Sequence, residues 1–317
     1  MKKYVLLLET IDDEADQLLR NSAIVIEAFD GSDIVKLAQS SDISAIITRG
    51  KGIVNKHLMD VCPHLEVVAR CGVGLDNIDV AEASRRKVKV INAPGSNSGT
   101  IAEHTLTLML MSIRNAWKSV ERVKAGDWAW RSRYQGDELR GKTLGILGMG
   151  NIGKRVAGLA SAFGMHVIFW DKFPVESEFK SFEMNEVLQR SDIVTIHVPL
   201  LSETANLIGR KELSLMQPHA ILINAARGAI VDEDALTEAL NMDYIAGFAA
   251  DVLATEPPPG DNPLVNHPKT LITPHSGSLT KTTYREMCVS TIENVVSILN
   301  GGKADPASVF NRESILP

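Results

Sequence analysis

Residues 145–153 read GILGMGNIG, in which the glycines at 148, 150 and 153 form the pattern G-x-G-x-x-G. An apolar run over 143–147 precedes this pattern, and residues 154–163 are expected to continue it as a helix. A second apolar run over 166–170 ends in Asp171. This order of strand, tight turn, helix, strand and acid predicts a βαβ unit that binds a dinucleotide.

Each part of this motif has a physical task. Gly148 permits the tight turn, Gly150 lets the backbone approach a pyrophosphate, and Gly153 lets the helix pack closely on the strand. The helix N-terminus attracts the phosphates, and Asp171 accepts hydrogen bonds from a ribose 2′-OH. Because an acid repels a 2′-phosphate, Asp171 favours NAD over NADP, although the neighbouring Lys172 softens that preference. The alternative is an ordinary βαβ turn with an unused glycine.

Composition excludes several classes of protein. The chain has 317 residues, enough for two domains, and its net charge of -6 provides no basic face for nucleic acid. No apolar run is long enough to cross a membrane, and the N-terminus does not resemble a signal peptide. Three cysteines, Cys62, Cys71 and Cys288, have the spacing of neither a disulfide framework nor a metal site. We therefore expect a cytoplasmic protein with reduced thiols and no metal.

Short apolar runs alternate with helical stretches in the first hundred residues and again after residue 144, which predicts two parallel sheets covered on both faces. The expected strands are 4–8, 23–28, 45–48, 67–69 and 88–91 in the first series, and 145–147, 167–170, 193–197, 220–224, 246–250 and 271–272 in the second.

Two helices are expected to connect the two series. The first, over 98–124, is predicted to be a single long, mostly buried helix that begins with Thr100 and Glu103 as a capping box. The second, over 283–299, would return the chain to the first domain. The fold class is therefore α/β with two doubly wound parallel-sheet domains. A Rossmann domain over 99–283 is expected to be inserted into a flavodoxin-like domain made of 1–98 and 284–317.

Three polar residues follow expected strands of the second series: Arg227, Glu256 and His275. Ligands bind at the carboxyl ends of such strands. Arginine can clamp a carboxylate and polarise a carbonyl, histidine can donate a proton near neutral pH, and a carboxylate can hold the imidazole in one tautomer. Each residue also has a structural interpretation: His275 as a cap, Arg227 as a partner of Asp232, and Glu256 as an exposed loop acid.

The chain resembles the D-isomer-specific 2-hydroxyacid dehydrogenase family over nearly its whole length. The resemblance rests on residues 141–153, on 191–200 (SDIVTIHVPL), on 224–228 (NAARG), on Asp251 and Val252 with Glu256 and Pro257, and on 273–275 (TPH). Residues 69–79 (ARCGVGLDNID) and 92–98 (NAPGSNS) match the family in the first domain. The preference for the D-isomer is implied by this resemblance alone.

The resemblance implies a role for each matching position. Arg227 would bind the substrate carboxylate and carbonyl, His275 would exchange the proton, and Glu256 would pair with His275. NAD would be bound by Gly148, Gly150, Asn151, Ile152, Gly153, Asp171, Val198, Pro199, Ala225, Ala226, Asp251 and Gly277, with Asp251 accepting from the nicotinamide carboxamide.

The first domain is expected to bind the substrate. Cys71, Gly72, Val73 and Gly74 would hold its carboxylate through backbone N–H groups, as in an anion nest, or would form a simple turn from strand to helix. Arg49 resembles the arginine near the substrate phosphate in phosphoglycerate dehydrogenases, so the substrate would carry a second anionic group. The alternative is a solvated loop arginine.

The expected function is thus NAD-dependent, reversible hydride transfer to a small 2-oxo acid. The closest pattern is that of phosphoglycerate dehydrogenase-like members without a C-terminal regulatory domain; phosphohydroxypyruvate, hydroxypyruvate and glyoxylate are candidate substrates. Relatives imply a homodimer, with the aromatic and basic residues of 128–134 at its contact. The alternatives are a non-catalytic, NAD-sensing corepressor on the same scaffold and a formate or phosphite dehydrogenase. Glu256 argues against formate oxidation, because formate enzymes pair their histidine with an amide.

Overall fold

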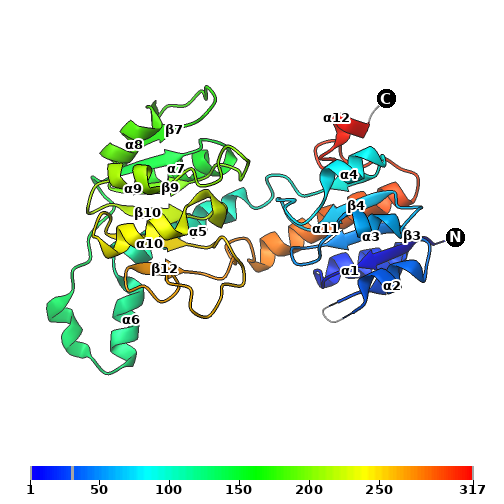
Figure 1. Cartoon of the computed structure of the whole chain (residues 1–317), viewed down its shortest axis with the longest axis horizontal. Helices are drawn as coiled ribbons and strands as arrows, with labels where there is room; N and C mark the ends of the chain where they lie inside the picture. The colour runs from blue at the N-terminus through cyan, green and yellow to red at the C-terminus, as the bar shows by residue number, and fades with distance from the viewer. Residues whose placement is uncertain (1, 30–31, 316–317) are drawn as a thin grey trace. The chain divides into compact units, whose positions relative to one another are not determined.

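The protein divides into two compact units in the computed structural model, which describes residues 2–29 and 32–315 (Figure 1). One unit comprises Met1–Asn97 with Leu279–Pro317, and the other comprises Ser98–Ser278. The second junction lies just before helix α11 (Lys281–Leu299), so the whole of that helix belongs to the first unit. Within the described ranges, none of the helices has both the length and the apolar character that a membrane span requires.

The first unit is built on five parallel strands in the order β2-β1-β3-β4-β5. This order is that of flavodoxin-like folds and confirms the predicted class. Alternate residues of β1 face opposite sides of the sheet: Val5 and Leu7 pack with α1 and α11, whereas Leu6 packs with the helices of the other face. The strands are β1 (Tyr4–Leu7), β2 (Ile24–Glu27), β3 (Ile43–Thr48), β4 (Val67–Arg70) and β5 (Lys89–Ile91), and the helices are α1 (Asp13–Ser22), α2 (Ile34–Gln39), α3 (Lys56–Asp60), α4 (Val80–Arg85), α11 and α12 (Arg312–Ile315).

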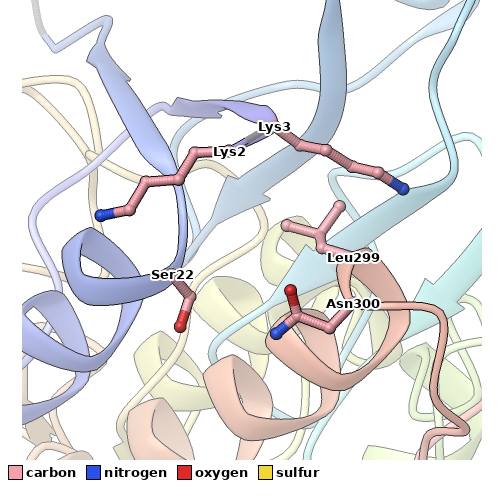
Figure 2. A pocket seen from close by; sticks show the side chains of 5 residues that line it. All are labelled: Lys2, Lys3, Ser22, Leu299 and Asn300. Atoms are coloured by element: carbon pink, nitrogen blue, oxygen red, sulfur yellow. The ribbon is translucent and has the colours of Figure 1, made fainter.

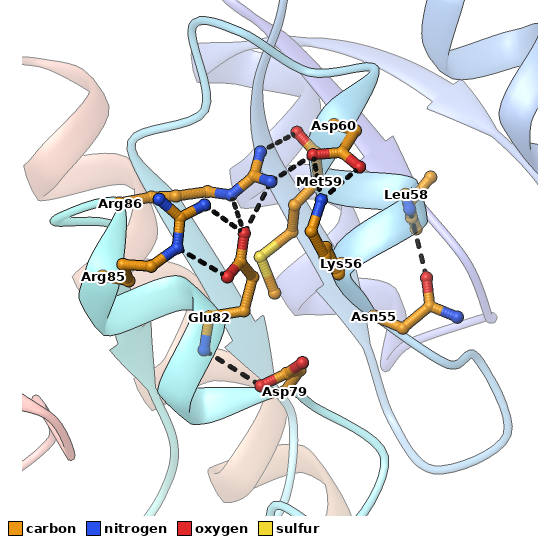
Figure 3. Close-up of polar contacts among 9 residues, drawn as sticks. All are labelled: Asn55, Lys56, Leu58, Met59, Asp60, Asp79, Glu82, Arg85 and Arg86. Atoms are coloured by element: carbon orange, nitrogen blue, oxygen red, sulfur yellow. Dashed lines mark hydrogen bonds and ion pairs between the residues drawn. The ribbon is translucent and has the colours of Figure 1, made fainter.

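A cluster of charges joins α3 to α4 (Figure 3). Arg86, directly after α4, donates to the carbonyl oxygen of Met59 at 2.7 Å and pairs with Asp60 at the end of α3. Glu82 accepts from both Arg85 and Arg86. Arg86 thus places a positive charge on the Met59 carbonyl in the last turn of α3, which suits the negative end of a helix.

The second unit is built on seven parallel strands in the order β12-β11-β10-β9-β6-β7-β8. Counted from β6, this is the Rossmann order with one further strand, as predicted. The two-residue edge strand β8 was not predicted, because it is short, exposed and polar. The strands are β6 (Thr143–Leu147), β7 (His166–Trp170), β8 (Lys180–Ser181), β9 (Ile193–Ile196), β10 (Ile221–Asn224), β11 (Gly247–Ala250) and β12 (Thr270–Ile272), and the helices include α7 (Asn151–Ala162), α8 (Met184–Arg190), α9 (Arg210–Leu215) and α10 (Glu233–Asn241).

The prediction of one long buried helix over 98–124 is wrong. The segment forms α5 (Ser98–Ile113) and α6 (Ala116–Lys124), separated at Asn115, whose φ of 46° lies in the left-handed region. Asparagine tolerates this conformation better than most residues, and it ends the regular helix. Only α5 has buried residues; α6 and the 3₁₀ segment Trp128–Arg133 extend away from the sheet (Figure 1).

The predicted capping box of α5 is also wrong. The helix begins at Ser98, so Thr100 lies inside its first turn and cannot act as the N-cap of a capping box with Glu103. The predicted first residue of the segment, Ser98, is therefore correct, and only the assignment of its cap was wrong.

Gly148 and Gly153 make close contacts that exclude a side chain. Gly148 has a φ of 100°, and a Cβ there would lie 2.8 Å from the carbonyl carbon of His197. A Cβ on Gly153 would lie 2.1 Å from the carbonyl oxygen of Gly148. The turn after β6 is therefore pressed against both the end of β9 and the first turn of α7, which fixes where that helix begins.

We predict that Gly153→Ala destabilises the second unit by about 1–3 kcal/mol, because the new methyl group overlaps the Gly148 carbonyl. Gly158 lies in the same helix with no atom within 4 Å of its ideal Cβ, so Gly158→Ala should stabilise by about 0.5–1 kcal/mol. Urea unfolding of the two variants measures both effects. Equal effects of the same sign would contradict this account of the turn.

Candidate active site

The predicted residues of the second unit lie at one edge of its sheet. Because all strands are parallel, the loops that follow β6, β9, β10, β11 and β12 emerge together at their carboxyl ends. The strand order reverses between β6 and β9, and the glycine turn lies at this point. The other predicted residues follow neighbouring strands: Val198 and Pro199 follow β9, Ala225, Ala226 and Arg227 follow β10, Asp251 and Glu256 follow β11, and His275 and Gly277 follow β12.

The N-terminus of α7 fits a bound phosphate. Gly150 is the N-cap residue and supplies no side chain to accept from the first-turn N–H groups, including those of Asn151 and Ile152. An ideal Cβ on Gly150 would meet no atom within 4 Å, so the space in front of the turn is open. Unpaired helix N–H groups beside open space attract an anion. The chain therefore has the features that a dinucleotide pyrophosphate requires.

Asp171 supports this turn from the end of β7. Its Oδ2 accepts from the Met149 N–H at 2.8 Å and its Oδ1 accepts from the Phe173 N–H at 3.0 Å. Each carboxylate oxygen can accept more than one bond, so a ribose hydroxyl can still be accommodated. Lys172 forms an exposed ion pair with Glu203 at 2.6 Å.

His275 and Glu256 are in direct contact. The Nδ1 atom of His275 lies 2.6 Å from Oε2 of Glu256, whose Oε1 accepts from the Leu253 N–H at 2.9 Å. Burial raises the pKa of Glu256, but the hydrogen bonds from His275 and Leu253 lower it by more than burial raises it. The pKa therefore ends below its ordinary value. The carboxylate is therefore charged at neutral pH, and its contact with Nδ1 directs the other ring nitrogen, Nε2, elsewhere.

Arg227 lies in a loop that contacts the Glu256 loop after β11. The backbone of Gly228 touches the chain after β11, since a Cβ on Gly228 would lie 1.9 Å from the carbonyl carbon of Leu253. Asn224 fixes the turn by donating to the Arg227 carbonyl oxygen at 2.9 Å, and Nη1 of Arg227 donates to the Ala226 carbonyl oxygen at 2.7 Å. The structure thus brings the loops of Arg227 and Glu256 together.

In the first unit, Arg49 lies at the corresponding edge. It follows β3, and its Nη1 donates to the Tyr284 hydroxyl at 3.2 Å while its guanidinium lies 5.5 Å from the centre of that ring. Its Nε is 3.8 Å from Oε1 of Glu9. Arg49 is therefore held in place rather than freely solvated.

Glu9 was missed by the sequence analysis. Its Oε2 accepts from the amides of residues 49–52 at 2.6–3.2 Å and from the Thr48 hydroxyl at 2.9 Å. Burial raises the pKa of Glu9, but these bonds lower it more, to about 2. In the sequence, Glu9 is an acid just after an expected strand. That pattern is too common to predict that its carboxylate binds the amides of residues 49–52.

Residues 71–74 follow β4 at this edge. Cys71 is 1% exposed and packs in the core, so any role in binding would belong to its backbone. The Gly72 N–H donates to the Arg70 carbonyl oxygen at 2.8 Å, and the Val73 carbonyl oxygen accepts from Asn92 at 2.7 Å. The expected role of these residues in holding a carboxylate stays a prediction.

A separate pocket of about 260 Å³ lies at the opposite end of the first unit (Figure 2). It is lined by Lys2, Lys3, Ser22, Leu299 and Asn300, which precede β1 and β2 or end α11. Its lysines already have partners, since Lys2 donates to the Arg20 carbonyl oxygen and Lys3 pairs with Glu66. It lies at the amino ends of the strands and has no part in the arrangement above.

Known proteins are similar to this chain in sequence and in fold. The family model described as D-isomer specific 2-hydroxyacid dehydrogenase, NAD binding domain, matches residues 106–277. The chain is 35% identical to D-3-phosphoglycerate dehydrogenase of Methanocaldococcus jannaschii, over 98% of this chain and 60% of that protein. It is 40% identical to glyoxylate reductase of Aeropyrum pernix, over 88% of this chain and 86% of that protein. The chain spans 54–60% of the length of three D-3-phosphoglycerate dehydrogenases that it matches.

Solved structures agree with the sequence comparison. A crystal structure of a protein from Thermus thermophilus superposes with a TM-score of 0.89 at 33% identity, covering 95% of this chain and 98% of that one. The NADPH-dependent glyoxylate/hydroxypyruvate reductase of Sinorhizobium meliloti, solved with NADP and malonate, has a TM-score of 0.86 at 27% identity and covers 98% of each chain.

We predict that Glu9→Gln destabilises the protein by about 3 kcal/mol at pH 7, the amount that corresponds to lowering the pKa of Glu9 from 4.5 to about 2. Because the folded-state pKa is lowered, this stability is present above about pH 4.5 and is lost as the pH falls toward 2. The difference between wild type and variant should therefore shrink on acidification, which urea unfolding at pH 7, 4 and 3 measures. A difference that is independent of pH would show that the Glu9 charge does not matter.

Proposed function

Because the chain belongs to the D-isomer-specific 2-hydroxyacid dehydrogenase family, we propose that it transfers hydride reversibly between a nicotinamide dinucleotide and a small 2-hydroxy acid. The observation that carries this proposal is the 2.6 Å contact between His275 and Glu256, at the same sheet edge as an open glycine turn. The nicotinamide cofactor, when bound, supplies or accepts the hydride.

His275 moves the proton. Its Nδ1 faces Glu256, which leaves Nε2 to protonate the carbonyl oxygen of a 2-oxo acid or to take the proton from the alcohol in reverse. Glu256 holds the ring in one orientation and stabilises its protonated form, because its own carboxylate is kept charged.

Arg227 binds the substrate in this proposal. A guanidinium presents N–H donors in a planar fork that matches a carboxylate, and its charge polarises an adjacent carbonyl. Its loop contacts the loop that bears Glu256, through Gly228 and Leu253, so the cation and the proton donor belong to one supported structure.

NAD is the proposed cofactor. The Asp171 carboxylate at the end of β7 disfavours a 2′-phosphate, and the adjacent Lys172 is paired with Glu203. The relative from Sinorhizobium meliloti is NADPH-dependent, so the ratio of kcat/KM for NADH and NADPH is the direct test.

A homodimer is also proposed. Val120, Val123 and Trp128 are 53%, 51% and 73% exposed on α6 and the segment after it. An extended arm with exposed apolar side chains favours burial against a second copy of the chain. Sedimentation of the wild type against Trp128→Asp tests this proposal.

The expected location remains the cytoplasm.

We predict that His275→Ala lowers kcat by about 10²–10⁴-fold, since general acid–base catalysis contributes about that much, while NADH binding is largely retained. The measurements are NADH oxidation with a panel of 2-oxo acids and NADH fluorescence titration. Near-normal turnover in the variant would refute the role of His275. A wild type that binds NADH but reduces no 2-oxo acid would favour the corepressor alternative.

We further propose that Arg49 binds a second anionic group of the substrate, as in a phosphorylated or carboxylated 2-oxo acid. Relatives named D-3-phosphoglycerate dehydrogenase support this, and the loop amides are already occupied by Glu9, so the guanidinium would provide the charge. Arg49→Ala should lower kcat/KM for phosphohydroxypyruvate by about 10–100-fold, the range of a charged hydrogen bond, and leave that for pyruvate nearly unchanged. A wild type that prefers pyruvate, with no effect of Arg49→Ala, would refute this.

A further inference from the structure

His275 adopts a backbone conformation that needs support. Its φ of 53° lies in the left-handed region, which is unfavourable for residues other than glycine. It forms part of a tight turn in which its own N–H donates to the Thr273 carbonyl oxygen at 3.0 Å. Such a conformation persists only when the surrounding structure holds it.

Asp251 provides this support from both sides of the turn. Its Oδ1 accepts from the Thr273 hydroxyl at 2.6 Å and from the Ser276 N–H at 3.0 Å, and its Oδ2 accepts from the Gly277 N–H at 2.7 Å. Asp251 is only 2% exposed, so water does not compete effectively for these bonds. The carboxylate therefore fixes Thr273, two residues before His275, and Ser276 and Gly277, directly after it.

His104, on the buried face of α5, completes this network. Its Nε2 lies 3.1 Å from the Thr273 hydroxyl oxygen and 3.4 Å from Oδ1 of Asp251. Because the Thr273 hydroxyl donates to Asp251, its oxygen accepts, and Nε2 of His104 is assigned as the N–H donor. An ideal Cβ on Gly277 would lie 3.0 Å from Cδ2 of His104, so imidazole and turn are also in close contact.

The charge of Asp251 fits this arrangement. Burial raises the pKa of Asp251, but the hydrogen bonds that it accepts lower it by more than burial raises it, so the pKa ends below its ordinary value. These bonds come from His104, Thr273, Gly277 and Ser276. The buried carboxylate therefore stays ionised, which strengthens each hydrogen bond that it accepts.

We propose that His104 is a positioning residue for His275: through Thr273 and Asp251 it holds the turn that presents the imidazole to Glu256. This inference rests on the proposed role of His275 and adds to it a residue on a different element, the helix α5.

The test compares His104→Ala with His104→Gln, whose side-chain amide restores an N–H donor. We expect His104→Ala to lower kcat about tenfold, equivalent to about 1.4 kcal/mol, with the dissociation constant of NADH changed by no more than about twofold. His104→Gln should recover most of the loss. Melting temperatures confirm folding, and His104→Leu, which fills the space without a donor, replaces the alanine variant if that one unfolds.

A matched control is His219→Ala. His219 forms a similar contact with Asp192, 2.7 Å from Nε2 to Oδ1, but at the amino ends of β9 and β10, so its loss should leave kcat unchanged. The inference is overturned if His104→Ala keeps wild-type kcat, if His104→Gln is as impaired as His104→Ala, or if weaker NADH binding explains the whole loss. A wild type that neither binds NADH nor reduces any 2-oxo acid overturns the proposed function as well, whereas an active wild type with a neutral His104→Ala overturns this inference alone.

Discussion

Hydrogen bonds from backbone amides to carboxylates hold the loops that follow the parallel strands in both units. Parallel strands end at one edge of a sheet, and the loops beyond that edge have amides that no ladder satisfies. Glu9 accepts from the amides of residues 49–52, Asp171 from that of Met149, and Asp251 from two amides after His275. Each acid comes from the end of a strand other than the one whose loop it holds, so these bonds position neighbouring loops relative to one another.

The same interaction prepares the proposed chemistry. Glu256 accepts from a backbone amide through one oxygen and contacts His275 through the other, and the balance of bonds over burial keeps it ionised. An ionised carboxylate can both orient an imidazole and stabilise its protonated form. The unfavourable backbone of His275 is then tolerated because Asp251 holds the residues on either side of it. The support of the His275 turn and the proposed proton transfer thus both depend on carboxylates that accept from backbone amides.

The apolar runs predicted both sheets, because strands that are buried on both faces consist of short, nearly continuous apolar runs. They failed where burial is absent, as in the exposed edge strand β8, and where a helix is interrupted by one residue, as at Asn115. The contact of His275 with Glu256 was expected from the family resemblance and is present in the structure. Glu9 and His104 were not identified, because each lies far in the sequence from the residues that it contacts.

Local pattern was sufficient for the fold class, the position of the glycine turn and the group of polar residues at one sheet edge, because each depends on residues that are neighbours in sequence or on the common direction of parallel strands. Tertiary structure alone decided which acid meets which amide, that Cys71 is buried, and that His104 contacts Thr273. These pairings depend on the lateral order of strands and on how α5 packs against the sheet. They join residues that are distant in sequence, and the local pattern of residues around each one carries no information about its partner.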